Sequence, residues 1–157
     1  MLRLIAQNRV QTRRLARALG RVALPGTVLG LEGDLGAGKT FFVEALARGL
    51  GVPREVPVTS PTFTLVHVLA GGRLPLVHVD LYRLDSGADI DELGLGEVLP
   101  GPGVTAVEWW SRMPAPRPEA LEIELRVRED LARELRVVAR GRRAAETLAA
   151  WRRAIDR

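Results

Sequence analysis

Residues 33–40 read Gly-Asp-Leu-Gly-Ala-Gly-Lys-Thr and fit G-x-x-x-x-G-K-[ST], the phosphate-binding P-loop. Glycines allow the backbone to curve into a nest whose N–H groups point at anionic oxygens. A helix that begins at about Lys39 adds the positive end of its dipole. Lys39 can reach the outer phosphates of a nucleotide, and Thr40 offers a hydroxyl to Mg²⁺. The loop therefore predicts binding of a triphosphate together with its magnesium ion.

Lys39 is the only lysine in the chain, which otherwise uses 22 arginines as its cations. A slim ammonium fits inside a backbone nest where a planar guanidinium does not. An ordinary glycine turn with a solvated cation has no such requirement. The single lysine therefore favours the phosphate-binding interpretation.

Two carboxylates each end a predicted buried strand. Asp80 ends the apolar run 74–80, the form of a Walker B strand whose acid holds Mg²⁺ or its water, and this role is favoured over capping of the next turn. Glu108 ends the run 103–108 in the same way. Two carboxylates beside a polyphosphate would repel it unless Mg²⁺ lay between them. Glu108 is therefore predicted to be either a metal ligand or the base that orients the attacking water.

Other polar and aromatic residues near these strands leave alternatives open. A threonine such as Thr62 often folds over the γ-phosphate as a switch in P-loop proteins, but Ser60-Pro61-Thr62 also suits a plain turn. His78 is interpreted as packed or partly exposed within its strand, not as a metal ligand. Trp109 and Trp110 either pack in the core or flank the site.

Predicted elements place these side chains at one edge of a sheet. Run 27–32 is a short, mostly apolar strand that leads into the P-loop, and apolar residues at i, i+3, i+4 and i+7 from Val43 predict the helix that follows it. In an open parallel sheet, ligands bind at the carboxyl ends of the strands, so Asp80 and Glu108 are expected to point towards the P-loop. The other predicted elements are a strand over 1–6, a helix from Asn8 that Gly20 closes, a hairpin of 64–69 with 74–79, a short helix and loop within 85–100, a hairpin of 121–127 with 134–139, and a final helix from about 142 to the C-terminus.

Length and composition predict one domain over residues 1–157, with the C-terminal helix 142–157 packed on it or partly extended. No apolar run approaches a membrane span of about 18 residues, and the N-terminus does not suit a signal peptide. The absence of cysteine excludes disulfides and cysteine-based metal or nucleophile chemistry. The P-loop predicts a cytoplasmic location, where nucleoside triphosphates are found.

The net charge is +4, and the excess of arginine is concentrated late in the chain. The residues concerned are Arg136, Arg140, Arg142, Arg143, Arg152, Arg153 and Arg157. Such a segment suits contact with nucleic acid or with an acidic protein, and equally a solvated helix face. Charge alone leaves both interpretations open.

Taken together, the motifs resemble the TsaE family, small P-loop ATPases needed in bacteria to make threonylcarbamoyladenosine in tRNA. The resemblance is carried by residues 33–40, 60–66 (Ser-Pro-Thr-Phe-Thr-Leu-Val), 78–84 (His-Val-Asp-Leu-Tyr-Arg-Leu), 93–95 and 107–109, and it spans about residues 12–140. It implies an α/β, P-loop NTPase-like fold with a mixed, mostly parallel sheet and helices on both faces. It also implies Mg²⁺-dependent ATP hydrolysis coupled to TsaD and TsaB, the proteins that transfer the threonylcarbamoyl group. Direct contact with tRNA is left open.

The resemblance assigns roles to individual residues. Thr40 and Glu108 match the magnesium ligands, Asp80 the Walker B acid and Thr62 the switch sensor. The expected catalytic residues are Lys39, Thr62, Asp80 and Glu108. The expected nucleotide-binding residues are Thr12, Asp34, Leu35, Gly36, Ala37, Gly38, Lys39, Thr40, Phe41 and Arg133. Phe41 replaces the second hydroxyl residue usual in the family. Since that position contacts the α-phosphate through its backbone N–H, the change is expected to be tolerated.

Two other functions compete with an ATPase that serves a tRNA-modifying complex. Small P-loop kinases usually carry an arginine-rich lid and a separate acceptor pocket, and no interval of this sequence suits either. A nucleotide-gated binding module, in which hydrolysis is incidental, would use the same residues. A GTPase is disfavoured because the chain has no Asn-Lys-x-Asp motif.

Overall fold

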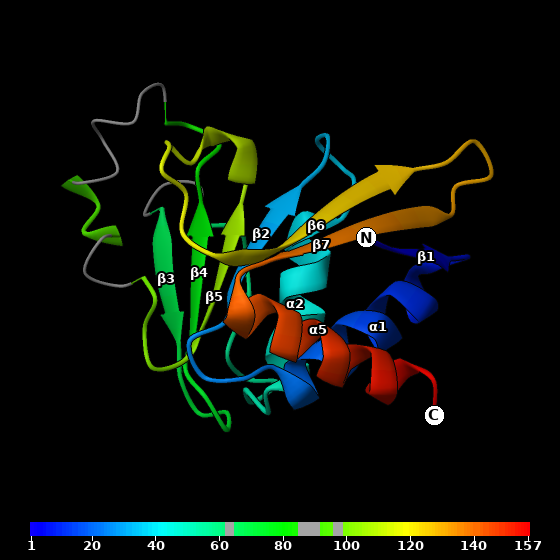
Figure 1. The fold of residues 1–157 in the computed structure, drawn as a ribbon, viewed down its shortest axis with the longest axis horizontal. Coiled ribbons are helices and arrows are strands. Elements are labelled where there is room, and N and C mark those ends of the chain that lie inside the picture. The colour runs from blue at the N-terminus through cyan, green and yellow to red at the C-terminus, as the bar shows by residue number, and fades with distance from the viewer. Residues whose placement is uncertain (62–64, 85–91, 96–98) are drawn as a thin grey trace.

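The computed structural model covers residues 1–157 and describes residues 1–61, 65–84, 92–95 and 99–157. One seven-stranded sheet runs through it in the order β1-β7-β6-β2-β5-β4-β3 (Figure 1). The strands are β1 (Leu2–Ala6), β2 (Val28–Glu32), β3 (Val66–Leu69), β4 (Leu76–Asp80), β5 (Val104–Glu108), β6 (Ala120–Val127) and β7 (Arg133–Arg140).

The centre of the sheet is parallel and its two edges are antiparallel. Strands β6, β2, β5 and β4 run in one direction, whereas β7, β1 and β3 join through antiparallel pairs. Strand β2 is buried on both faces, which is why its sequence is nearly all apolar and does not alternate. The prediction of an α/β fold with a mixed, mostly parallel sheet is confirmed.

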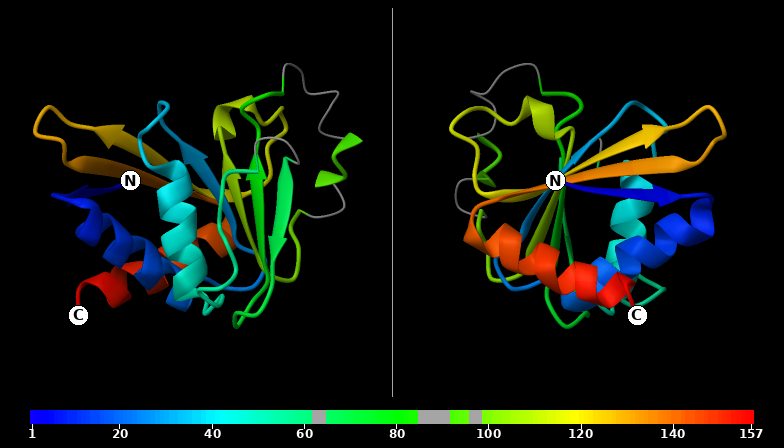
Figure 2. Two further views of the ribbon diagram at one scale, coloured as in Figure 1. Left: turned by 180° about the vertical axis from the view of Figure 1, so that it is seen from behind. Right: turned by 45° about the vertical axis from the view of Figure 1, so that its right-hand side comes forward.

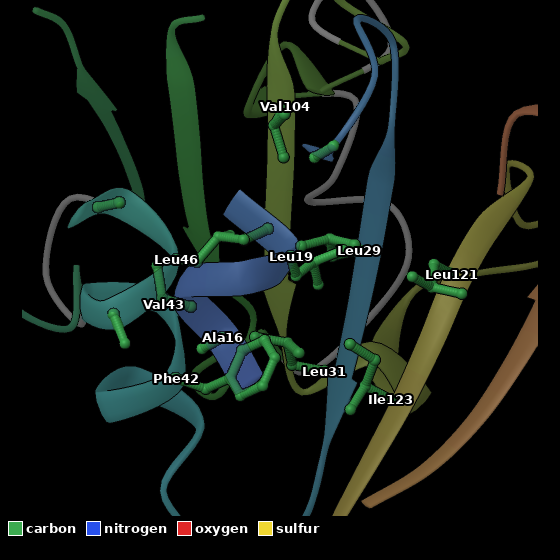
Figure 3. Close-up of a cluster of buried hydrophobic side chains, with 14 of the residues drawn as sticks. Ala16, Leu19, Leu29, Leu31, Phe42, Val43, Leu46, Val104, Leu121 and Ile123 are labelled. Carbon is green, nitrogen blue, oxygen red and sulfur yellow. The ribbon is translucent and has the colours of Figure 1, made fainter. Parts of the chain in front are cut away.

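Three helices, α1 (Arg9–Val22), α2 (Lys39–Gly49) and α5 (Arg142–Ile155), pack on one face of the sheet. Leu29 and Leu31 of β2 point into this layer, where Figure 3 shows them beside Phe42 of α2 and Leu19 of α1. On the other face, the 3₁₀ helix η1 (Trp110–Arg112) joins a second apolar cluster. Among the described residues, the three α-helices thus lie on one face, and a single 3₁₀ turn is added on the other.

The contact between α1 and α2 depends on two glycines. A Cβ atom at Gly20 would lie 2.3 Å from the carbonyl oxygen of Leu46, and one at Gly49 would lie 2.3 Å from that of Arg17. The prediction that Gly20 closes the first helix is therefore wrong, since α1 continues to Val22. Glycine serves here for close approach of two backbones, not as a helix terminator.

Helix α5 is anchored to both α1 and the sheet. Its Trp151 is fully buried and donates from Nε1 to the carbonyl of Leu15 at 2.9 Å. Its Thr147 hydroxyl lies 2.8 Å from that of Thr27, at the entrance to β2. Figure 2 shows α1 and α5 next to each other below the β6–β7 hairpin. None of the helices in the described part of the chain has the length and apolar character needed to cross a membrane.

Candidate active site

The loop between β2 and α2 has the geometry that its sequence predicted. Gly36 and Gly38 have φ angles of 79° and 107°, in the region that favours glycine. A Cβ atom at either position would meet open space, so backbone conformation and not crowding requires glycine there. Helix α2 begins directly after Gly38, and the free N–H groups of its first turn face the loop. The loop is therefore built to receive an anion.

Lys39 lies inside this loop and is only 5% exposed. Its Nζ donates to the carbonyl of Asp34 at 3.1 Å and to the carbonyl of Gly33, and it lies 4.1 Å from the ring centroid of Trp109. Burial lowers the pKa of the Lys39 ammonium, an effect that nearby carboxylates, Glu108 first, partly oppose. The loop thus holds its cation through its own carbonyls and an aromatic face.

The two strand-end acids lie side by side next to the P-loop. Asp80 of β4 pairs in register with Glu108 of β5, and each is about 3% exposed. The Thr40 hydroxyl donates to Oε1 of Glu108 at 2.8 Å. Asp80 accepts hydrogen bonds from the Ser60 hydroxyl and from the Tyr82 N–H. The carboxyl ends of two neighbouring parallel strands therefore meet the start of α2, as the topology rule predicts.

Two adjoining cavities share Gly36, Gly38 and Phe41. The first, about 340 Å³, is lined by Lys39, Thr40, Ser60, Asp80, Glu108 and Trp109 together with the loop. The second, about 490 Å³, is lined on its far side by Gln7, Asn8, Arg9, Thr12, Leu131 and Arg133. A charged cavity beside a roomier one suits the two ends of a nucleotide.

Of the other predicted site residues that the structure describes, all but Asp34 line these cavities; they are Thr12, Leu35, Ala37, Phe41 and Arg133. Arg133 donates from Nε to the carbonyl of Ala37 at 3.1 Å, which ties β7 to the P-loop. The Phe41 ring lies beneath the guanidinium of Arg9, 4.6 Å from its centroid. Asp34 and Leu35 form the exposed side of the loop. The predicted switch residue, Thr62, lies outside the described residues.

The structure separates the two tryptophans that sequence left undecided. Trp109 has a φ angle of 60°, which turns its ring to the Lys39 side, whereas Trp110 is buried against Gly30. A Cβ atom at Gly30 would lie within 2.7 Å of the Trp110 ring, so a glycine in mid-strand makes room for it. Trp109 therefore flanks the site and Trp110 belongs to the core.

Sequence reasoning missed the part that His78 plays in the site. The side chain is fully buried, and its Nε2 lies 2.7 Å from Oε1 of Glu108. The signal that could have found it is the two-residue period of a strand, which puts His78 on the same face as Asp80. A histidine inside an apolar run is typical of a packed side chain, and no local pattern shows that it lies next to Glu108.

The donor atoms of the first cavity fit magnesium. They are a hydroxyl and carboxylates, the hard oxygen ligands that Mg²⁺ prefers. Within the described part of the chain, no group of three or more His, Asp or Glu side chains could hold a metal ion unaided.

Comparisons with known proteins identify relatives of this chain. Residues 6–135 match the family model described as threonylcarbamoyl adenosine biosynthesis protein TsaE. The tRNA threonylcarbamoyladenosine biosynthesis protein TsaE of Treponema pallidum is 43% identical over 87% of this chain and 99% of its own length. The protein of the same name from Bacillus subtilis is 42% identical over 87% of this chain and 84% of its own. The crystal structure of Bacillus subtilis YdiB superposes with a TM-score of 0.81 at 36% identity, covering 99% of this chain and 96% of that one.

Proposed function

Because the chain belongs to the TsaE family, we propose that it is a Mg²⁺-dependent ATPase that supports threonylcarbamoyl modification of tRNA adenosine. The relatives' names place them in the biosynthesis of threonylcarbamoyladenosine. In this proposal the chain works in the cytoplasm, and ATP hydrolysis allows the TsaD–TsaB complex to turn over.

One observation carries the proposal: the 2.8 Å hydrogen bond from the Thr40 hydroxyl to Glu108 Oε1. It joins the first turn of the P-loop helix to the end of β5, two places where a phosphate and a metal-binding acid are expected to meet. Asp80 stands in register beside Glu108, so a second carboxylate lines the same cavity. An anion nest bordered by two buried acids makes chemical sense when a cation lies between the acids and the anion.

Each residue then has a defined task. The backbone N–H groups of residues 34–41 bind phosphate oxygens, and Lys39 exchanges the loop carbonyls for the outer phosphates. Thr40 and Glu108 would hold Mg²⁺, and Asp80 would hold the ion or one of its waters. The bound ion supplies neutralisation of the charge that develops on the transferred phosphoryl group. Thr12 and Arg133 contact the nucleoside end in the larger cavity.

The test is single-turnover release of phosphate from ATP, measured with and without TsaD and TsaB. We expect slow release from the chain alone and faster release with the partners. Glu108→Gln should abolish the partner-dependent release while circular dichroism shows an intact fold. Glu55→Gln, which removes an exposed carboxylate from the loop after α2, at the end of that helix away from Lys39, is the matched control and should behave as wild type.

The same assay distinguishes the competing functions. If ATP binding recruits the partners but neither wild type nor Glu108→Gln releases phosphate, the chain is a nucleotide-gated binding module. That result would overturn the proposed ATPase activity. Transfer of the γ-phosphate to an added metabolite would identify a kinase.

A further inference from the structure

His78 and Thr40 converge on one oxygen of Glu108. His78 Nε2 lies 2.7 Å and Thr40 Oγ1 lies 2.8 Å from Oε1 of that carboxylate. An ionised carboxylate only accepts hydrogen bonds, so Nε2 of His78 carries the proton and donates it. The histidine side chain is fully buried, so the bond is shielded from competing water.

The two hydrogen bonds to Oε1 leave Oε2 of Glu108 and the hydroxyl oxygen of Thr40 available to a ligand. Oε2 of Glu108 accepts no hydrogen bond from the residues that the structure describes. The Thr40 hydroxyl gives its proton to Oε1 and keeps its lone pairs. Rotation of the carboxylate is therefore fixed from one side while Oε2 and the Thr40 oxygen remain available.

Packing alone does not explain a histidine at this position. Its Nδ1 is buried and has no hydrogen-bond partner among the described residues. Leucine would fill a similar volume at this position without leaving a buried acceptor unpaired. A buried polar atom without a partner calls for an explanation, and functional sites are one place where such atoms are retained.

We propose that His78 is a positioning residue that holds Glu108 in the orientation needed to bind Mg²⁺. The inference rests on the proposed function, because it deepens the role given there to Glu108. His78 touches neither ATP nor the ion. It acts through the carboxylate in the way that hydrogen-bond partners of metal ligands orient them elsewhere.

The hydrogen bond itself is tested by NMR of the nucleotide-free protein. The chain has only two histidines, His67 and His78, so the imidazole nitrogen spectrum is simple to assign. We expect a slowly exchanging proton on Nε2 of His78, and Glu108→Gln should shift its signal. The absence of a proton on Nε2, or a signal that Glu108→Gln leaves unchanged, would overturn the proposal. This measurement uses neither nucleotide nor metal.

The effect on magnesium is tested by calorimetry of ATP binding over a range of Mg²⁺ concentrations. His78→Leu should raise the Mg²⁺ concentration needed for half-maximal tightening by about 10- to 100-fold. Affinity for ATP without Mg²⁺ should stay unchanged. His78→Gln places an amide N–H near the Nε2 position and should recover part of the loss. The matched control is His67→Leu, the same change at the residue that pairs with His78 on β3. Because the hydrogen bond to Glu108 comes from His78, this variant should show the Mg²⁺ dependence of wild type.

The double variant decides whether His78 acts through Glu108. In the Glu108→Gln background, His78→Leu should cause no further loss of Mg²⁺ dependence. An equal loss in both backgrounds, or a loss of ATP affinity that does not need Mg²⁺, would overturn the proposal. If the ATP affinity of the wild-type protein does not change with Mg²⁺ concentration, the proposed function itself is refuted, whatever the NMR result for His78.

Discussion

Lys39 combines burial with a positive charge, and at the scale of single residues it gives the sharpest prediction. Lys39→Ala removes the only ammonium side chain from the anion nest. One charge-assisted contact to phosphate is worth about 1.5–3 kcal/mol, so ATP affinity should fall about ten- to over a hundredfold by calorimetry.

Lys39→Arg separates charge from shape. The planar guanidinium keeps the charge but does not fit the loop in which Nζ contacts the carbonyls of Gly33 and Asp34. We expect it to bind ATP almost as poorly as Lys39→Ala. Wild-type affinity in Lys39→Ala would contradict the role given to Lys39, and wild-type affinity in Lys39→Arg would show that charge alone suffices.

The residues that sequence predicted are those whose chemistry is tied to a local pattern. Lys39 and Thr40 follow from the P-loop spacing, and Asp80 and Glu108 each end an apolar strand. The structure places all four around one cavity. The sequence did not assign His78 or Trp109 to the site, because their roles depend on tertiary geometry. The hydrogen bond of His78 crosses to the neighbouring strand, and the orientation of Trp109 follows from a positive φ angle that the residue type does not favour.

At the scale of elements, the approach of α1 to α2 depends on Gly20. In an isolated helix, alanine is favoured over glycine by about 1 kcal/mol. At Gly20, however, the added Cβ atom would lie 2.3 Å from the Leu46 carbonyl oxygen. Overpacking typically costs about 1–3 kcal/mol, so Gly20→Ala should lower the free energy of unfolding. Urea unfolding measures this, and an increase in stability would show that the helices can separate without cost.

The outer edge of the sheet is held by an ion-pair network centred on Glu134 of β7. Arg3 of β1 donates to both carboxylate oxygens at 2.9 and 3.0 Å, and Arg136 donates to one at 2.6 Å. The hydrogen bonds from Arg3 and then Arg136 lower the pKa of Glu134 from its ordinary 4.5 to about 2. The folded chain thus keeps this carboxylate ionised at pH values where the unfolded chain protonates it.

A pH dependence of stability follows. Above about pH 4.5 the network contributes fully, and its contribution is lost as the pH falls from there to about 2. Urea unfolding should show Glu134→Gln less stable than wild type at pH 7, with the gap narrowing across this window. Glu129→Gln, at the exposed turn, should show no such gap. A gap of constant size from pH 7 to pH 2 would contradict the shift.

Element boundaries were predictable where signals are local and not where packing decides. Residues 27–32 and the helix after the P-loop match β2 and α2, because glycines and apolar spacing mark their ends. Gly20 looked like a helix end because glycine often is one. Its actual role depends on Gly49, a residue of another helix, and no local pattern contains that information.

At the scale of the whole molecule, positive charge gathers on two neighbouring helices. Helix α1 carries five arginines and no acid, and α5 carries four arginines and one glutamate. These two helices therefore have a net charge of +8, against +4 for the whole chain, which leaves −4 for the remainder. The Trp151–Leu15 hydrogen bond holds the two helices together, so their charges form one field.

That asymmetry extends the C-terminal arginine cluster seen in the sequence to a surface that includes α1, and it leads to a prediction about tRNA. Contacts between arginines and phosphates release counterions, so if this surface binds tRNA, the affinity should fall about tenfold or more between 50 and 200 mM salt. The double change Arg14→Gln with Arg153→Gln, at exposed positions of α1 and α5, should weaken binding and flatten the salt response. Arg126→Gln with Arg128→Gln removes the same charge from the far end of β6 and should do neither.

A flat salt response in wild type would show that this surface does not bind RNA. Salt-sensitive binding to the TsaD–TsaB complex without tRNA would assign the surface to an acidic protein instead.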